Sequence, residues 1–161
     1  MKNTKPKLYL GSDHAGYKLK EEMKPYLQEL GYTFVDLGSF NEESVDYPDI
    51  AREVCEKILE NKDAFGILIC GTGVGVMMSA NKHPGIRAVV CTHELMATMA
   101  RKHNNANVLC LGSRIIGSEL SKSIIKTFLE TEFEREERHI RRVEKIESQL
   151  EDNKKSTQES D

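Results

Sequence analysis

Reactive side chains follow three short apolar segments of this chain. They are a carboxylate and an imidazole in Gly11-Ser12-Asp13-His14-Ala15-Gly16, a thiol and a hydroxyl in Cys70-Gly71-Thr72-Gly73-Val74-Gly75, and a guanidinium in Gly112-Ser113-Arg114. If the apolar segments are parallel strands, these residues gather at the carboxyl edge of one sheet, where open α/β sheets bind their ligands. Such a set is suited to holding and protonating an oxygen-rich, negatively charged ligand.

The segment Gly71–Gly75 joins a predicted strand to a predicted helix. Its glycines allow a sharp turn that exposes several N–H groups, and a helix N-terminus adds positive potential. The segment could therefore bind a phosphate or the oxygen of an enediolate, or it could be a turn with a structural role only. A nucleotide loop fits less well, because G-x-G-x-G is not G-x-G-x-x-G, follows the third strand, and lacks the Gly-Lys-Ser/Thr ending.

Cys70, directly before this loop, has two interpretations. A cysteine at the end of a strand is usually a small buried hydrophobe. Alternatively, the helix N-terminus and neighbouring N–H groups could favour its thiolate, which could then take a proton from carbon or attack an electrophile. The position of Cys70 favours the second interpretation only slightly.

Asp13 and His14 precede the first predicted helix. Asp13 could cap that helix, and His14 could be a solvated loop residue. Equally, two adjacent ionisable residues at the carboxyl edge could position and protonate a ligand. Both interpretations stay open.

His103-Asn104-Asn105 follows the fourth predicted helix and precedes the fifth strand. It therefore belongs near the amino edge of its own sheet, away from the residues described above. Histidine and asparagine suit a helix C-terminus, which is one explanation. The other is that His103 completes the site of a neighbouring subunit, which makes a homodimer with shared sites a concrete hypothesis.

Arg138 and Arg142 are four residues apart and share one helical face, with Arg135 one turn earlier. Spacing of four also allows an ion pair between Glu134 and Arg138, as expected for a solvated, charged helix. Two convergent arginines are equally suited to a phosphate dianion. The sequence alone leaves this undecided.

The elements that must position these residues alternate along the chain. Segments with helical spacing, such as Leu19, Met23 and Leu27, separate continuous apolar runs that are typical of strands buried on both faces. Five such runs occur, at residues 8–10, 34–35, 67–70, 88–90 and 108–111. We expect an α/β fold, a doubly wound, Rossmann-like parallel sheet of about five strands in three αβα layers, with an additional C-terminal helix. Pro25 is expected to kink the first helix.

Residues 1–150 are expected to form a single domain, and the polar residues 151–161 a disordered tail. The 161 residues carry 23 Lys and Arg against 26 Asp and Glu, a formal net charge of −3, so the basic footprint of a nucleic-acid-binding protein is missing. No apolar stretch approaches the roughly 20 residues that span a bilayer. Four cysteines without C-x-x-C spacing indicate reduced thiols in a cytoplasmic protein rather than disulfides or a zinc site.

Together the motifs resemble a known family. The segments Gly11–Gly16, Asp46-Tyr47-Pro48-Asp49, Cys70–Gly75, His103-Asn104 and Arg138-His139 are similar, in order, to those of the type B ribose-5-phosphate isomerases. The resemblance covers about residues 6–147 and includes relatives that act on galactose 6-phosphate and allose 6-phosphate. It implies a Rossmann-like homodimer, with a dimer of such dimers as the alternative, that needs neither a metal nor an organic cofactor.

The resemblance also implies an aldose–ketose isomerisation through an enediolate. Cys70 would move the proton between C2 and C1, Asp13 would assist transfer between O1 and O2, and His103 would help to open the furanose ring. Thr72 would support ring opening or hold the substrate. The remaining implied ligands are Gly71, Gly73, Val74 and Gly75 at the enediolate, Tyr47 and Asn104 at the sugar, and His14, Arg114, Arg138 and Arg142 at the phosphate, some of them from the second subunit.

Some relatives use a glutamate in the loop as the base, but Val74-Gly75-Val76 holds no acid here, which places this chain in the cysteine subtype. Ribose 5-phosphate is the expected substrate, and a hexose 6-phosphate is the alternative within the family. A non-catalytic phosphosugar-binding module is the alternative from another class, although it would have no need of Cys70 alongside Asp13 and His103.

Overall fold

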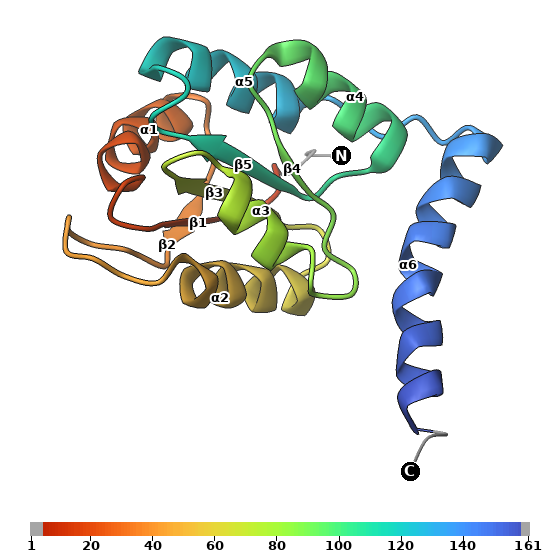
Figure 1. The fold of residues 1–161 in the computed structure, drawn as a ribbon. Coiled ribbons are helices and arrows are strands. Elements are labelled where there is room, and N and C mark those ends of the chain that lie inside the picture. Colours follow the sequence, from red (N-terminus) through yellow and green to blue (C-terminus); the bar gives the residue numbers. More distant parts are fainter. Residues whose placement is uncertain (1–4, 159–161) are drawn as a thin grey trace.

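The structure, a computed structural model, describes residues 5–158 and consists of strands that alternate with helices (Figure 1). The first half contains β1 (Leu8–Ser12), α1 (Tyr17–Glu29), β2 (Phe34–Asp36), α2 (Tyr47–Glu60), β3 (Phe65–Cys70) and α3 (Val74–Ala80). The second half contains β4 (Ala88–Val90), α4 (Glu94–Asn104), β5 (Val108–Gly112), α5 (Ser118–Glu130) and α6 (Glu137–Gln158).

The five strands form one parallel sheet in the order β2-β1-β3-β5-β4. The chain moves outward from β1 to β2 and then returns to place β3 on the other side of β1. In open α/β sheets such a reversal of strand order marks the place where ligands bind, which here is the carboxyl ends of β1 and β3. Register brings Ser12 beside Ile69 and Cys70 beside Gly112, so the ends of β1, β3 and β5 lie next to one another. The predicted Rossmann-like parallel sheet is confirmed.

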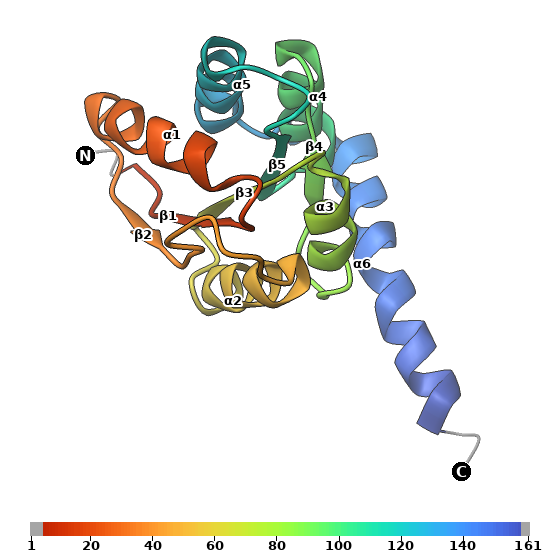
Figure 2. The same cartoon turned by 60° about the vertical axis from the view of Figure 1, so that its left-hand side comes forward.

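Helices cover both faces of the sheet, as Figure 2 shows. Side chains of α1, α4 and α5 pack with Ile67 and Ile69 of β3 on one face. Side chains of α2 and α3 pack with Leu68 and Cys70 on the other. Because successive strand residues point to opposite faces, both faces of β3 need apolar side chains, which explains its continuous apolar run.

α1 continues as one helix through Pro25, as expected from the sequence. α6 runs to Gln158 and so includes residues 151–158, whereas 159–161 lie outside the described part of the chain. Disorder of the tail 151–161 in solution stays a prediction. The absence of apolar residues argues against a core, but glutamate and lysine are good helix formers and can continue a helix that has already started.

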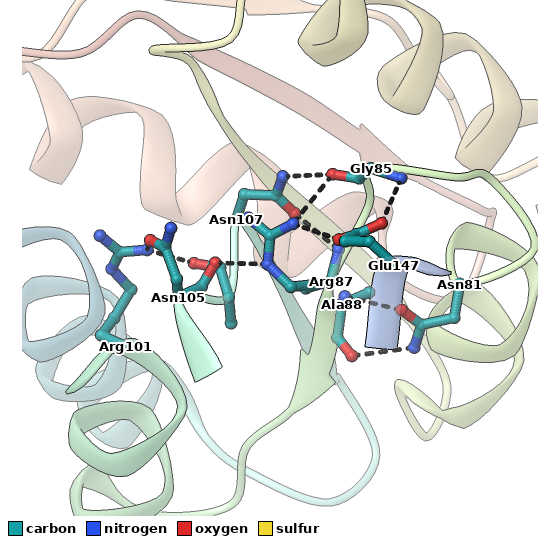
Figure 3. Close-up of polar contacts among 9 residues, drawn as sticks. Asn81, Gly85, Arg87, Ala88, Arg101, Asn105, Asn107 and Glu147 are labelled. Atoms are coloured by element: carbon teal, nitrogen blue, oxygen red, sulfur yellow. Dashed lines mark hydrogen bonds and ion pairs between the residues drawn. The ribbon is translucent and has the colours of Figure 1, made fainter. Parts of the chain in front are cut away.

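α6 lies beside the β4 side of the sheet rather than in either helical layer (Figures 1 and 2). Its Glu147 carboxylate accepts a hydrogen bond from the Gly85 N–H at 2.9 Å and forms an ion pair with the Arg87 guanidinium, as drawn in Figure 3. Arg87 also donates from Nε to the carbonyl of Asn105 at 2.9 Å. The contact thus joins α6 to the start of β4 and the end of α4. None of the described helices is long and apolar enough to cross a membrane.

Candidate active site

The loop after β3 is shaped around the sulfur of Cys70. Gly73 has φ +79°, a left-handed conformation that favours glycine, and its N–H donates a hydrogen bond to Cys70 Sγ at 3.1 Å. A Cβ on Gly73 would lie 2.8 Å from Val90 Cγ2 and 3.0 Å from the carbonyl carbon of Leu111. The loop thus directs a backbone N–H donor at the Cys70 sulfur.

The other cysteines have different surroundings. Burial raises the pKa of the Cys91 thiol to about 12, and burial with a smaller effect of Glu56 does the same for Cys55. The pKa of Cys110 is raised well above its usual value, mainly by burial. These three thiols are protonated, inert parts of the core, as expected for buried cysteines.

Asp13 and His14 flank this loop from the end of β1. The Asp13 N–H donates to the Ile69 carbonyl at 3.2 Å, which places the two residues beside the strand that carries Cys70. Asp13 Oδ1 accepts the Gly16 N–H at 3.0 Å and so holds the turn before α1. His14 Nδ1 accepts the Val45 N–H at 3.3 Å, so the neutral ring carries its proton on Nε2. His14 therefore presents a donor and is not simply a solvated loop residue.

Tyr47, Thr72 and Arg114 complete this edge. A Cβ on Gly75 would lie 2.8 Å from Tyr47 Cζ, and one on Gly71 would lie 3.2 Å from Arg114 Nη1, so the two side chains lie against the loop at different points. Thr72 Oγ1 accepts the Val74 N–H at 3.3 Å. The structure therefore brings together the predicted residues Asp13, His14, Tyr47, Cys70, Gly71, Thr72, Gly73, Val74, Gly75 and Arg114.

The other predicted residues form a separate group where α4 meets α6. His103 and Asn104 end α4, which leads into the amino end of β5, and Arg138 and Arg142 lie on α6. The C-cap itself is Asn105, with φ +47°, rather than His103. Asn104 and both arginines are exposed. His103 thus lies at the amino edge, as the order of elements predicted, and no hydrogen bond within residues 5–158 links this group to Cys70 or Asp13.

Two residues near His103 received no role from the sequence. The His103 and His139 rings are stacked, with centroids 4.3 Å apart and planes at 12°. The Nε2 atom of each ring lies 3.9 Å from Glu134 Oε2. The proximity of His139 to the recognised Arg138 was the only sequence signal for this cluster.

The charges of this cluster follow from its neighbours. Loss of water, together with His103 and Arg138, lowers the pKa of His139, so that ring is neutral at pH 7. The hydrogen bond from Lys102 lowers the pKa of Glu134, so the carboxylate is ionised. The predicted Glu134–Arg138 helix pair was wrong: α6 begins at Glu137, Glu134 pairs with Lys102 at 3.0 Å, and Arg138 pairs with Glu136 at 2.8 Å.

Two cavities lie away from the Cys70 loop. One of about 880 Å³ lies at the amino edge of the sheet and is lined by residues such as Lys7, Asn61 and Arg101. The other, of about 470 Å³, lies between α6 and the β4–α4 region, with Asn104 and Glu147 in its wall. Neither includes Cys70 or Asp13.

Comparison with known proteins places this arrangement in context. The family model described as Ribose/Galactose Isomerase matches residues 8–146. Ribose-5-phosphate isomerase B of Escherichia coli is 44% identical over 140 residues, covering 87% of this chain and 93% of its own. A Mycoplasma genitalium protein named probable ribose-5-phosphate isomerase B is also 44% identical, over 86% of this chain and 92% of its own.

Solved structures agree. Ribose-5-phosphate isomerase B of Clostridium thermocellum has a TM-score of 0.89 and 46% identity, covering 91% of this chain and 99% of that one. The Thermotoga maritima enzyme has a TM-score of 0.86 and 50% identity, covering 89% and 98%. The resemblance deduced from the motifs is confirmed, and this chain belongs to the ribose/galactose isomerase family.

Proposed function

We propose that this chain is an aldose–ketose isomerase that interconverts D-ribose 5-phosphate and D-ribulose 5-phosphate. The relatives that match nearly its whole length carry the name ribose-5-phosphate isomerase B. The observation that carries the proposal is the 3.1 Å hydrogen bond from the Gly73 N–H to Cys70 Sγ, beside a nearly buried Asp13 carboxyl group. A sulfur that accepts this hydrogen bond at a ligand-binding edge is placed to act as the base that takes a proton from carbon.

In the proposed reaction the Cys70 thiolate takes the C2 proton of the open-chain aldose. The C2–H electron pair forms the C1–C2 double bond, and the carbonyl pair moves onto O1, giving a cis-enediolate. Asp13 transfers a proton between O2 and O1, so that the C2 carbonyl can form while Cys70 returns its proton to C1. The product is the ketose, and both residues regain their starting state.

The loop stabilises the charge that develops in this reaction. The enediolate concentrates negative charge on oxygen, and preorganised N–H donors stabilise it more than the uncharged carbonyl of the substrate. These donors come from Gly71, Thr72, Gly73, Val74 and Gly75. Two of the N–H groups, those of Gly73 and Val74, would be shared with Cys70 Sγ and Thr72 Oγ1. Tyr47 lies against Gly75 and Arg114 against Gly71, so each borders the place where the substrate would bind.

The second group of residues would serve the site of a partner copy. His103, which we assign to ring opening, lies apart from Cys70 in one chain, together with Asn104, Arg138 and Arg142. His14 Nε2–H, with Arg114, would bind the phosphate at the Cys70 edge, joined by Arg138 and Arg142 of the second copy. Large exposed apolar side chains on α3, α4 and the β5–α5 loop, namely Met78, Leu95 and Ile115, support a homodimer. Four free cysteines support a cytoplasmic location.

The substrate is tested by comparing kcat/KM for ribose 5-phosphate, allose 6-phosphate and galactose 6-phosphate. We expect ribose 5-phosphate to give the highest value. If a hexose phosphate is the best substrate, the chain is a hexose-6-phosphate isomerase instead. Galactose is the second sugar that the family description names. Tight binding of all three without turnover would replace it by a phosphosugar-binding module.

The shared site is tested by complementation. Cys70→Ala and His103→Ala chains are unfolded together and refolded, and each is refolded alone as the control. In a shared site, each mixed dimer has one site with both residues intact, so the mixture regains activity that neither variant has. Failure to regain activity in verified mixed dimers would contradict the shared site.

A further inference from the structure

A cluster of possible metal ligands lies at the corner where α4 meets α6. His103 comes from the last turn of α4, Glu134 from the segment between α5 and α6, and His139 from the first turn of α6. One ligand atom from each residue lies within 4.8 Å of the others. Two imidazoles and a carboxylate form a donor set that proteins use for Zn²⁺.

His139 is buried in a way that the fold does not explain. Its exposed fraction is 2%, and neither ring nitrogen has a hydrogen-bond partner within the described part of the chain. Burying a polar group without a hydrogen-bond partner is unfavourable, so such groups usually have one. A neutral imidazole with both nitrogens unpaired is a ready metal ligand.

Glu134 is already turned toward the two rings. Its N–H donates to the Lys102 carbonyl at 3.0 Å, which fixes the backbone, and Lys102 Nζ holds Oε1 at 3.0 Å. Oε2 is then left facing His103 Nε2 and His139 Nε2, at 3.9 Å from each. The lysine thus orients the carboxylate and leaves one oxygen for a metal ion.

We propose that His103, Glu134 and His139 form a site for Zn²⁺. Ligand atoms about 2.0–2.1 Å from a tetrahedral zinc ion are about 3.4 Å apart, so the 3.9 Å separations need to shorten by about 0.5 Å. The stacked rings cannot both direct a lone pair to one ion without rotation. The His103 side chain, 41% exposed, supplies this rotation, whereas His139 is held by its packing.

The donor types select the metal. Mg²⁺ and Ca²⁺ prefer sets of oxygen ligands, whereas imidazole suits zinc and its neighbours in the first transition series. Three protein ligands leave the fourth tetrahedral position to water. Because neutral imidazoles and an ionised carboxylate are the binding forms, the affinity for zinc falls in acid.

Zinc at this site would inhibit the enzyme, an inference that rests on the proposed function of His103 in ring opening. A bound ion takes the Nε2 lone pair of His103 and turns the ring away from its stacked position. Neither event is compatible with proton transfer to or from a sugar in a partner's site. The site would therefore make isomerisation sensitive to free zinc without any metal taking part in catalysis.

Binding is measured first, on the full chain after treatment with EDTA, by calorimetry with Zn²⁺ and by absorption with Co²⁺ as a spectroscopic substitute. We expect wild-type protein to bind one Zn²⁺ per chain, and Glu134→Gln and His139→Asn each to weaken binding at least tenfold. The control is His83→Gln, which alters a histidine in the α3–β4 loop and should bind as the wild type does. Unchanged affinity in Glu134→Gln would overturn the proposal, because this change replaces a half-exposed carboxylate by an amide of the same size and leaves the core intact.

The Co²⁺ spectrum distinguishes this site from binding at Cys70. Nitrogen and oxygen ligands give only weak visible bands, whereas a thiolate adds an intense near-ultraviolet charge-transfer band. That band in the wild type would mean that Cys70 holds the metal and would also overturn the proposal.

Inhibition is measured separately. Zn²⁺ should abolish turnover of ribose 5-phosphate, EDTA should restore it, and Glu134→Gln should need at least tenfold more Zn²⁺. If zinc binds at the cluster and turnover is undiminished, inhibition is refuted. If the metal-free enzyme does not turn over ribose 5-phosphate at all, the proposed function is refuted, but the result on zinc binding still stands.

Discussion

The ring of Tyr47, at the start of α2, lies against the backbone of Gly75, where a Cβ would approach Tyr47 Cζ to 2.8 Å. The contact joins α2 to the glycine loop, although the two are far apart in the chain. Gly75→Ala would therefore push the ring, a flexible side chain that is 40% exposed, out of its position. We expect KM for ribose 5-phosphate to rise several-fold while the free energy of unfolding changes by less than about 1 kcal/mol. Tyr47→Phe, which keeps the ring, is the matched control, and a normal KM in Gly75→Ala would contradict the contact's role.

Cys70→Ala removes the proposed base without removing a large binding contact. We expect kcat to fall by several orders of magnitude, while the affinity for ribose 5-phosphate, measured by calorimetry, changes little. Cys110→Ala is the control, because it removes a buried thiol of the same sheet that carries no proposed chemistry. Normal turnover in Cys70→Ala would show that another group is the base.

Alkylation should separate Cys70 from the other cysteines. A thiol with a pKa of about 12, such as Cys55 or Cys91, is ionised at pH 7 in only about one molecule in 10⁵, and only the thiolate reacts. A small reagent such as iodoacetamide should therefore modify Cys70 alone in the folded protein, and activity should disappear in step with that modification. Peptide mass spectrometry identifies the site; equal modification of Cys55 would contradict the expected order.

The sequence predicted the position of a site residue correctly where the order of strands and helices alone determines that position. Continuous apolar runs predicted the parallel strands, and strand ends then placed Asp13, Cys70 and Arg114 together. The same order placed His103 at the opposite edge. The cluster of Glu134 and His139 was not predictable, because it depends on the path of the residues between α5 and α6 and on the residue at which α6 begins. The partner of Glu134 was misassigned for the same reason.

Glu147→Ala tests how α6 is held. The substitution leaves the Gly85 N–H without its acceptor and Arg87 without its ion pair, both partly buried. We expect the free energy of unfolding to fall by about 1–3 kcal/mol and amide hydrogen exchange in α6 to increase. Because α6 carries Arg138 and Arg142, affinity for ribose 5-phosphate should fall as well. Glu144→Ala, an exposed change on the same helix, should do neither.

The buried Lys20–Asp36 pair should dominate the response to acid. Burial opposes ionisation of Asp36, but hydrogen bonds from Lys20 and Lys24 outweigh it and lower the Asp36 pKa. For Lys20, 1% exposed against 12% for Asp36, burial outweighs the pairing and lowers the pKa. An acid with a lowered pKa stabilises the fold above its unfolded pKa of about 3.9 and loses that contribution as pH falls through the folded value.

Asp36→Asn is therefore expected to cost about 3–5 kcal/mol at pH 7, because it removes the nearest counter-charge of the buried Lys20 ammonium and leaves only the Glu21 carboxylate at 3.8 Å. The double variant Lys20→Met/Asp36→Asn should recover most of that loss. Urea unfolding at pH 7 and pH 3 measures both, and the difference between the two pH values should be smaller in Asp36→Asn than in the wild type. A single variant as stable as the wild type would refute the interpretation.

Gly112 at the end of β5 has a consequence for how the Cys70 loop could be changed or transferred. A Cβ there would lie 2.6 Å from both the carbonyl carbon and the oxygen of Thr72, and one on Gly73 would meet Leu111. The loop that follows β3 thus packs directly against the backbone of β5. A side chain at Gly73 or at Gly112 would push the loop and the strand apart. The loop conformation therefore depends on Gly112 as well as on residues 70–75. Grafting residues 70–75 alone onto another parallel sheet would transfer the sequence of the loop without the contacts that set its conformation.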